Sequence, residues 1–96
     1  MASSKEFKDF ILEQLRDLQD IACRPMMGEF LLYYNGVLFG GIYDNRLLIK
    51  KTNSNKHFNL TEAIPYKNAK PMYMVVDVDN VEYLSELVKI TCEGLN

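Results

Sequence analysis

Apolar residues are densest between positions 27 and 50, in three runs separated by two short polar joints. The runs are residues 27–34, 37–43 and 46–50, and the joints are Asn35-Gly36 and Asp44-Asn45. Asn-Gly is a strong hairpin signal because both central residues of a type I′ turn need positive φ, and Asp-Asn is a weaker form of it. The pattern predicts a three-stranded antiparallel meander.

Two amphipathic helices are predicted, one near each end of the chain. Ser3 and Glu6 have the spacing of a capping box, and apolar residues then recur at three- and four-residue steps, which predicts a helix over residues 4–20. Asp79 and Glu82 repeat this spacing before a second apolar stripe, which Gly94 is expected to end.

The segment between the meander and the second helix is more mixed. Residues 58–63 are expected to form a short helix that Pro65 ends, and residues 72–77 read as a strand that begins after Pro71. The predicted fold is two-layer α+β: an antiparallel sheet made of the meander plus one or two further strands, with the N- and C-terminal helices packed on one face. The order is α-β-β-β-α-β-(β)-α.

The two turns also predict a register. Tyr34 would pair with Val37 and Leu32 with Phe39, while Ile42 would pair with Leu47. One face would then carry a mainly aliphatic set under the helices: Leu31, Tyr33, Leu38, Gly40, Ile42, Leu47 and Ile49. The other would carry Phe30, Leu32, Tyr34, Val37, Phe39, Gly41, Tyr43, Arg46, Leu48 and Lys50.

The second predicted face is too apolar for a solvated sheet surface, since antiparallel sheets usually alternate apolar and polar sides. A contiguous apolar patch commonly marks an interaction surface. We therefore expect a protein partner or a second copy of the chain to bind there, giving a homodimer in the second case. The alternative is that the chain's own short helix and C-terminal segment cover it. The predicted partner face comprises Phe30, Leu32, Tyr34, Phe39, Tyr43, Arg46, Leu48 and Lys50.

Charge is distributed unevenly along the chain. Residues 46–70 carry six basic and one acidic side chain, whereas the whole chain has a net charge of −2. This basic segment is a candidate anion-binding surface for a small ligand or a nucleic acid, with Lys51, Lys56, Lys67 and Lys70 as its members. Tyr34, Tyr43 and Tyr66 could supply stacking. The alternative is a solvated loop with ordinary lysines.

Composition limits the class of protein. A chain of 96 residues with 48% hydrophobic and 25% charged residues is expected to form one domain with one core. No apolar run approaches the ~20 residues of a membrane span, and no secretory signal is recognisable. Cys23 and Cys92 form no CxxC pair and are expected to be reduced thiols, which predicts a cytoplasmic protein, although a disulfide between them stays open.

Catalytic and metal-binding patterns are weak. The single histidine, His57, lies in a polar segment, and no phosphate-binding glycine loop occurs. Asp77, Asp79 and Glu82 resemble a metal cluster, but helix capping and a strand end explain them. We therefore expect no enzyme activity, no cofactor and no metal.

The order of short motifs along the chain resembles the TfoX/Sxy N-terminal domain family. The motifs are Phe7-x-x-Phe10-Ile11, Arg24-x-Met26-Met27-Gly28-Glu29, Leu32-Tyr33-Tyr34, Phe39-Gly40-Gly41-Ile42-Tyr43, Arg46-Leu47-Leu48-Ile49-Lys50, Pro65-Tyr66 and Ala69-Lys70-Pro71-Met72. The resemblance covers nearly the whole chain. It implies a single domain over residues 1–96, without the second domain that long members carry.

The resemblance also implies a role. Long members of the family regulate natural competence and promote expression of DNA-uptake genes together with the cyclic-AMP receptor protein. The family has no established catalytic residues. The expected function is therefore that of a non-enzymatic cytosolic regulatory domain acting through protein partners, and the alternative is a small-ligand or nucleic-acid-binding domain using residues 46–70.

Overall fold

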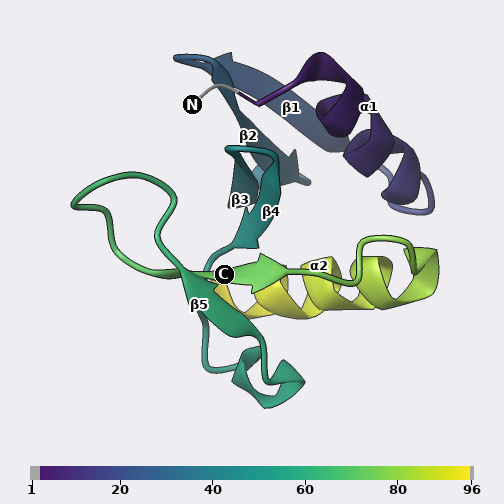
Figure 1. Cartoon of the computed structure of the whole chain (residues 1–96). Helices are drawn as coiled ribbons and strands as arrows, with labels where there is room; N and C mark the ends of the chain where they lie inside the picture. The colour runs from purple at the N-terminus through teal and green to yellow at the C-terminus, as the bar shows by residue number, and fades with distance from the viewer. Residues whose placement is uncertain (1–2, 96) are drawn as a thin grey trace.

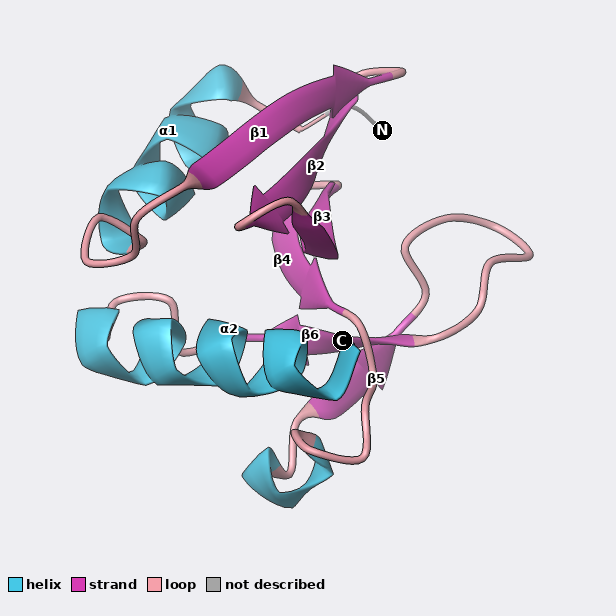
Figure 2. Cartoon of the chain, turned by 180° about the vertical axis from the view of Figure 1, so that it is seen from behind, coloured by secondary structure: helices cyan, strands magenta, loops and turns pink. Residues whose placement is uncertain are grey.

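The computed structural model describes residues 3–95 and has an α+β fold with one antiparallel sheet and two helices (Figure 1). The sheet has six strands in the order β1-β2-β3-β4-β6-β5. The elements are α1 (Lys5–Gln14), β1 (Ile21–Met26), β2 (Glu29–Tyr34), β3 (Val37–Tyr43), β4 (Arg46–Ile49), the 3₁₀ turn η1 (Lys56–Phe58), β5 (Thr61–Ala63), β6 (Met72–Val75) and α2 (Val81–Leu95). Both helices lie on one face of the sheet (Figure 2). The predicted fold class is confirmed.

The predicted meander corresponds to β2, β3 and β4, and both of its turns have the expected backbone. Asn35 and Gly36 have φ values of 50° and 80°, and Asp44 and Asn45 have 54° and 55°. Positive φ at both central residues defines a type I′ turn, whose twist matches that of the strands it joins. The local sequence was sufficient to place these two hairpins.

A further hairpin precedes the meander and was not predicted. β1 pairs with β2 through a turn at Met27 and Gly28, which have φ values of 52° and 85°. Pro25 lies within β1, but β1 is an edge strand, where a missing backbone N–H is tolerated. Because methionine is not a usual residue at positive φ, the sequence carries little sign of this turn.

The short helix expected over residues 58–63 is wrong. Only η1 is helical there, and Asn59, with φ of 58°, ends it. Thr61–Ala63 instead forms β5, whose residues pair with Met72, Tyr73 and Met74 of β6. A tertiary pairing with a distant strand therefore overrides the local preference of this segment.

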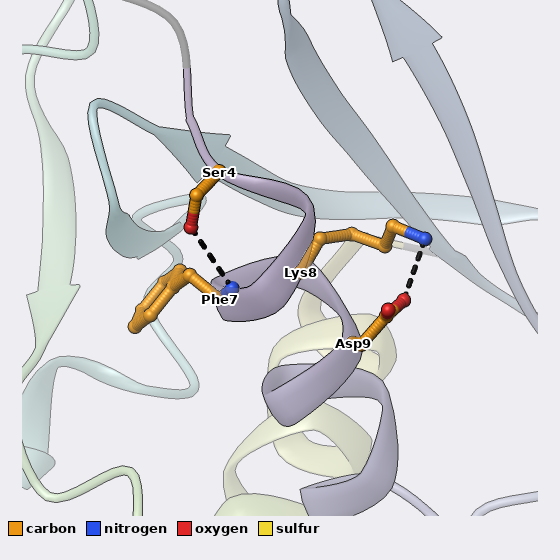
Figure 3. Close-up of polar contacts among 4 residues, drawn as sticks. All are labelled: Ser4, Phe7, Lys8 and Asp9. Carbon is orange, nitrogen blue, oxygen red and sulfur yellow. Dashed lines mark hydrogen bonds and ion pairs between the residues drawn. The ribbon is translucent and has the colours of Figure 1, made fainter.

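Helix α1 begins and ends at other residues than the pattern indicated. The N-cap is Ser4, whose Oγ accepts a hydrogen bond from the Phe7 backbone N–H at 3.0 Å (Figure 3). Ser3 is unavailable because its Oγ and its N–H both donate to the Glu29 carboxylate. The helix ends at Gln14, and turns continue the chain to Asp20.

An exposed ion pair follows this cap on α1. Lys8 Nζ lies 2.7 Å from Asp9 Oδ1 (Figure 3), and this hydrogen bond raises the pKa of Lys8 and lowers that of Asp9. Exposed pairs of this kind contribute little to stability.

Helix α2 is capped by Asn80 and not by Asp79. The Asn80 Oδ1 atom accepts a hydrogen bond from the Tyr83 N–H at 3.0 Å. Gly94 does not stop the helix, since the helix runs to Leu95. A Cβ at position 94 would lie 2.9 Å from the Thr52 Cβ, so glycine is needed where α2 packs closely on the 52–54 segment.

The predicted register between β2 and β3 is only partly right. Tyr34 pairs with Val37 and Tyr33 with Leu38, but Leu32 then pairs with Gly40 instead of Phe39. One extra residue in β3 forms a β-bulge at this point, which changes the direction in which later side chains point. The register between β3 and β4 is as predicted, with Ile42 opposite Leu47.

The bulge changes which residues form the core. Leu32 and Phe39, both 0% exposed, pack with Ile11 and Leu15 of the N-terminal segment and with α2. The predicted helix-covered residues Ile42, Leu47 and Ile49 do lie in this core. Leu31, Tyr33 and Leu38 do not, because the shifted register places them on the opposite side. The partly buried residues that pack against the core from the sheet include Phe30, Tyr34 and Val37.

Candidate binding groove on the open sheet face

The sheet face turned away from α1 and α2, called the open face below, carries Leu31, Tyr33, Leu38, Tyr43, Leu48 and Met74. Leu48 is the cross-strand partner of Gly41 on one side and of Met74 on the other. Directly opposed residues of neighbouring strands share a face, so the pairing places these side chains together. Tyr43 and Leu48 are buried but lie outside the core that the helices cover.

The segment connecting β5 and β6, residues 64–71, extends on the side of the sheet opposite α2 (Figure 2). Arg46 anchors its start: Nη2 donates to the Ile64 carbonyl and Nε donates to the Tyr43 carbonyl, each at 3.1 Å. The Tyr66 ring lies 6.2 Å from the Tyr43 ring, centroid to centroid. This connection partly covers the open face, and Leu95 at the end of α2 lies beside it.

A groove of about 510 Å³ lies between this connection and the sheet. Its walls are β3, the two residues after β4, the connection, the first residue of β6 and the last residue of α2. It is lined by Leu38, Gly40, Tyr43, Lys50, Lys51, Pro65, Tyr66, Ala69, Lys70, Pro71, Met72 and Leu95. This volume is typical of small-molecule sites, which are mostly apolar with a few polar groups.

The predicted partner face does not exist as one surface. Leu32 and Phe39 are fully buried in the helix-covered core, and Phe30 and Tyr34 pack against that core. Leu48 belongs to the open face but is 0% exposed. These corrections follow from the bulge in β3, because one extra residue exchanges the two faces.

Besides Leu48, three members of the predicted partner face come together on the open face. Tyr43 and Lys50 line the groove, and Arg46 holds the connection that forms its far wall. Burial raises the pKa of the Tyr43 phenol, and its neighbours Tyr66, Glu29 and Tyr33 add to this effect.

The predicted anion-binding lysines do not form one cluster. Lys51 and Lys70 line the groove, whereas Lys56 and Lys67 do not. Lys51 Nζ is paired with Glu62 Oε2 at 2.6 Å and lies 5.6 Å from the centre of the Tyr73 ring. That hydrogen bond raises the pKa of Lys51. Within residues 3–95, Lys50 and Lys70 form no ion pair.

Sequence reasoning missed Leu38 and Met72 as groove residues. Leu38 was assigned to the helix-covered face by the uncorrected register, and Met72 was predicted only as the start of a strand. No local signal marks either residue, because each reaches the groove only through strand pairing across the sheet.

A buried asparagine fixes the end of β4 beside the groove. Asn55 is 0% exposed, and its Nδ2 donates to the Lys50 carbonyl at 2.9 Å and to Thr91 Oγ1 at 2.8 Å. Its Oδ1 accepts from the Thr52 N–H at 3.0 Å. This network joins the segment after Lys50 to α2, so the backbone that carries Lys50 and Lys51 is held in place.

The two cysteine thiols are poorly suited to act as nucleophiles. Both cysteines are free, Cys23 partly buried and Cys92 buried. Burial raises the pKa of each thiol, although Lys8 partly offsets this for Cys23. A raised pKa lowers the thiolate fraction at neutral pH, and the thiolate is the reactive form. His57 is exposed next to Phe58 on η1.

No group of three or more His, Cys, Asp and Glu side chains within residues 3–95 is arranged to hold a metal ion. Nor does any helix of that range combine the length and the apolar character needed to cross a membrane.

The raised pKa of Tyr43 predicts an effect of pH. A phenol with a higher pKa in the folded state stabilises the fold below its ordinary pKa of 10.0, and this contribution is lost as pH rises through the folded pKa. Tyr43→Phe should therefore remove a late component from the tyrosinate absorbance titration and flatten the alkaline fall in the free energy of unfolding. Identical curves for wild type and Tyr43→Phe would contradict the prediction.

Comparison with known proteins identifies the fold family. The model of the TfoX N-terminal domain matches residues 13–94, which include the whole sheet and most of α2. The chain belongs to the TfoX N-terminal domain family. This TfoX N-terminal domain is also 28% identical over 98 residues to an uncharacterised 12.7 kDa protein encoded in the trpE 5′ region of Spirochaeta aurantia. The alignment covers 99% of this chain and 85% of that protein.

Proposed function

We propose that this TfoX N-terminal domain is a non-enzymatic cytoplasmic interaction domain that regulates gene expression through a protein partner bound on the open face. The observation that carries the proposal is the one-sided sheet. Both helices cover one face, whereas the open face keeps Leu31, Tyr33 and Met74 only partly buried. Family membership supports the regulatory role, with DNA-uptake genes as the target that the competence regulators imply.

The charge at the margins of the open face specifies the partner further. Arg24 is the cross-strand partner of Leu31, and Arg46 is the partner of Tyr43, so arginines border the apolar strip at two places. A partner surface with an apolar centre and carboxylates at its rim would complement this arrangement. The alternative occupant is a second copy of the chain, which would make the domain a homodimer.

Position-specific photo-crosslinking tests the surface. Benzoylphenylalanine placed at Tyr33, on the open face, should crosslink a protein in the organism that encodes the chain. The matched control is Phe10, an aromatic residue on the opposite layer that is 38% exposed. Light scattering on the purified domain identifies the partner as a second copy if the mass is that of a dimer.

A functional readout accompanies the crosslinking. Tyr33→Asp should lower transcript levels of the DNA-uptake genes, while Phe10→Asp should not, provided circular dichroism shows that both variants fold. Equal crosslinking from both positions, or transcript levels that neither variant changes, would refute the proposal.

A further inference from the structure

All the charged side chains that line the groove on the open face are positive. Its lining contains three lysines and no aspartate or glutamate, although the chain has 13 acidic residues and a net charge of −2. Glu62, just outside the lining, neutralises Lys51. Lys50 at the end of β4 and Lys70 on the facing connection are left as two positive charges on opposite walls.

The rest of the lining is apolar and includes two aromatic rings. The Tyr43 and Tyr66 rings are tilted by 52° at a centroid distance of 6.2 Å, and Leu38 and Met72 extend the apolar wall. Tyr66 is 60% exposed, so its ring is accessible to a ligand. Tyrosine rings bind planar groups by stacking at small conformational cost, because the ring itself is rigid.

The distribution of positive charge indicates the size of the ligand. Lys56 and Lys67 lie outside the groove, so its positive charge does not continue into a track of the kind that follows a nucleic-acid backbone. A volume of about 510 Å³ lies within the range for small-molecule sites. The lining therefore fits a compact molecule with one anionic end.

We infer that this groove binds a small organic anion with a planar ring. The ring lies against Tyr43 and Tyr66, and the carboxylate or phosphate group is held between Lys50 and Lys70. This inference does not depend on the protein partner proposed above. Because the connection supplies Tyr66 and Lys70 while the sheet supplies Tyr43 and Lys50, such a ligand joins the connection to the open face.

An NMR titration of the whole chain tests the site with four probes. These are 1-naphthyl phosphate, 1-naphthoate, 1-naphthol and inorganic phosphate, which separate the ring from the charge and a phosphate from a carboxylate. We expect saturable shifts of the Tyr43, Lys50, Tyr66 and Lys70 amides with one or both ring-bearing anions. Their affinity should exceed that of naphthol and of phosphate by about tenfold, the effect of a charge-assisted hydrogen bond.

Two double variants change the net charge equally, so a difference in binding between them reports the position of the lysines. Lys50→Gln/Lys70→Gln should weaken binding of the ring-bearing anion by about tenfold or more, whereas Lys56→Gln/Lys67→Gln should leave it within about twofold. These lysines form no ion pair within residues 3–95, so both variants are expected to fold. Tyr66→Ala should weaken the binding of the ring-bearing anions and leave the binding of inorganic phosphate unchanged.

Several results would overturn the inference. Equal losses in the two double variants would mean long-range attraction and no specific site. Saturable shifts confined to residues outside the groove, or no saturable shift with any probe, would refute it outright. The crosslinking from Tyr33 is measured without any of these probes, so failure of the groove and failure of the partner surface are distinguishable.

Discussion

Phe39→Ala is expected to lower the free energy of unfolding by about 3–5 kcal/mol, the usual cost of removing a large aromatic side chain from a core. Phe39 is 0% exposed and packs with residues of α1 and α2. The neighbouring Leu38 lies on the opposite side of the sheet and is only partly buried. Leu38→Ala should therefore cost less, about 1–2 kcal/mol. Urea unfolding followed by circular dichroism measures both values.

This pair of variants also tests the β-bulge. In a regular strand with the predicted register, Leu38 would face the helices and Phe39 would be on the other face, so the order of the two losses would be reversed. A larger loss for Leu38→Ala than for Phe39→Ala would contradict the observed register. If the two side chains pack in separate clusters, the loss of unfolding free energy in the Leu38→Ala/Phe39→Ala double variant should be nearly the sum of the losses in the two single variants.

Gly40→Ala is the second change with a large expected effect, about 3 kcal/mol or more. A Cβ at position 40 would collide with the backbone carbonyl oxygen of Leu48 and lie 2.9 Å from the Ile49 Cα. Backbone atoms of a paired strand cannot move aside without breaking the β3–β4 ladder. We therefore expect a large fall in the thermal midpoint or loss of soluble protein.

Gly36→Ala is the matched control for this substitution. Gly36 lies in the β2–β3 turn with φ of 80°, and a Cβ there would meet no atom within 4 Å. Its cost should be about 1–2 kcal/mol, from the left-handed backbone alone. A Gly40→Ala protein as stable as Gly36→Ala would show that the strands can separate at position 40, contrary to the structure.

The spacing of two core residues along β3 explains why the two faces of the sheet could not be predicted from the sequence. Phe39 and Ile42 are three positions apart, so a regular strand would send their side chains to opposite sides. Both are in the helix-covered core because the bulge lies between Leu38 and Gly40, so the alternation of side chains is reversed between Phe39 and Ile42. Period-two reasoning has no means of detecting a bulge that is stabilised by packing against α1 and α2.

The groove could not be predicted from local sequence patterns either. The basic character of residues 46–70 was evident from composition, and Tyr43 and Tyr66 were named as possible stacking residues. Which lysines meet depends on the pairing of β4 with β6, which brings the segment before Met72 back across the sheet. Lys70 lines the groove as a result, whereas Lys67, only three residues earlier in the chain, does not.

Features that depend on a few adjacent residues were predictable from the sequence. Asn35-Gly36 and Asp44-Asn45 specify their turns through their own φ preferences, and the amphipathic stripes specify two helices. Features that depend on contacts between distant segments were settled by the folded chain: the bulge in β3, the strands β1 and β5, and the groove at the open face. The physical reason is that a turn is decided by local dihedral energy, whereas the choice of buried face is decided by the packing of the whole core.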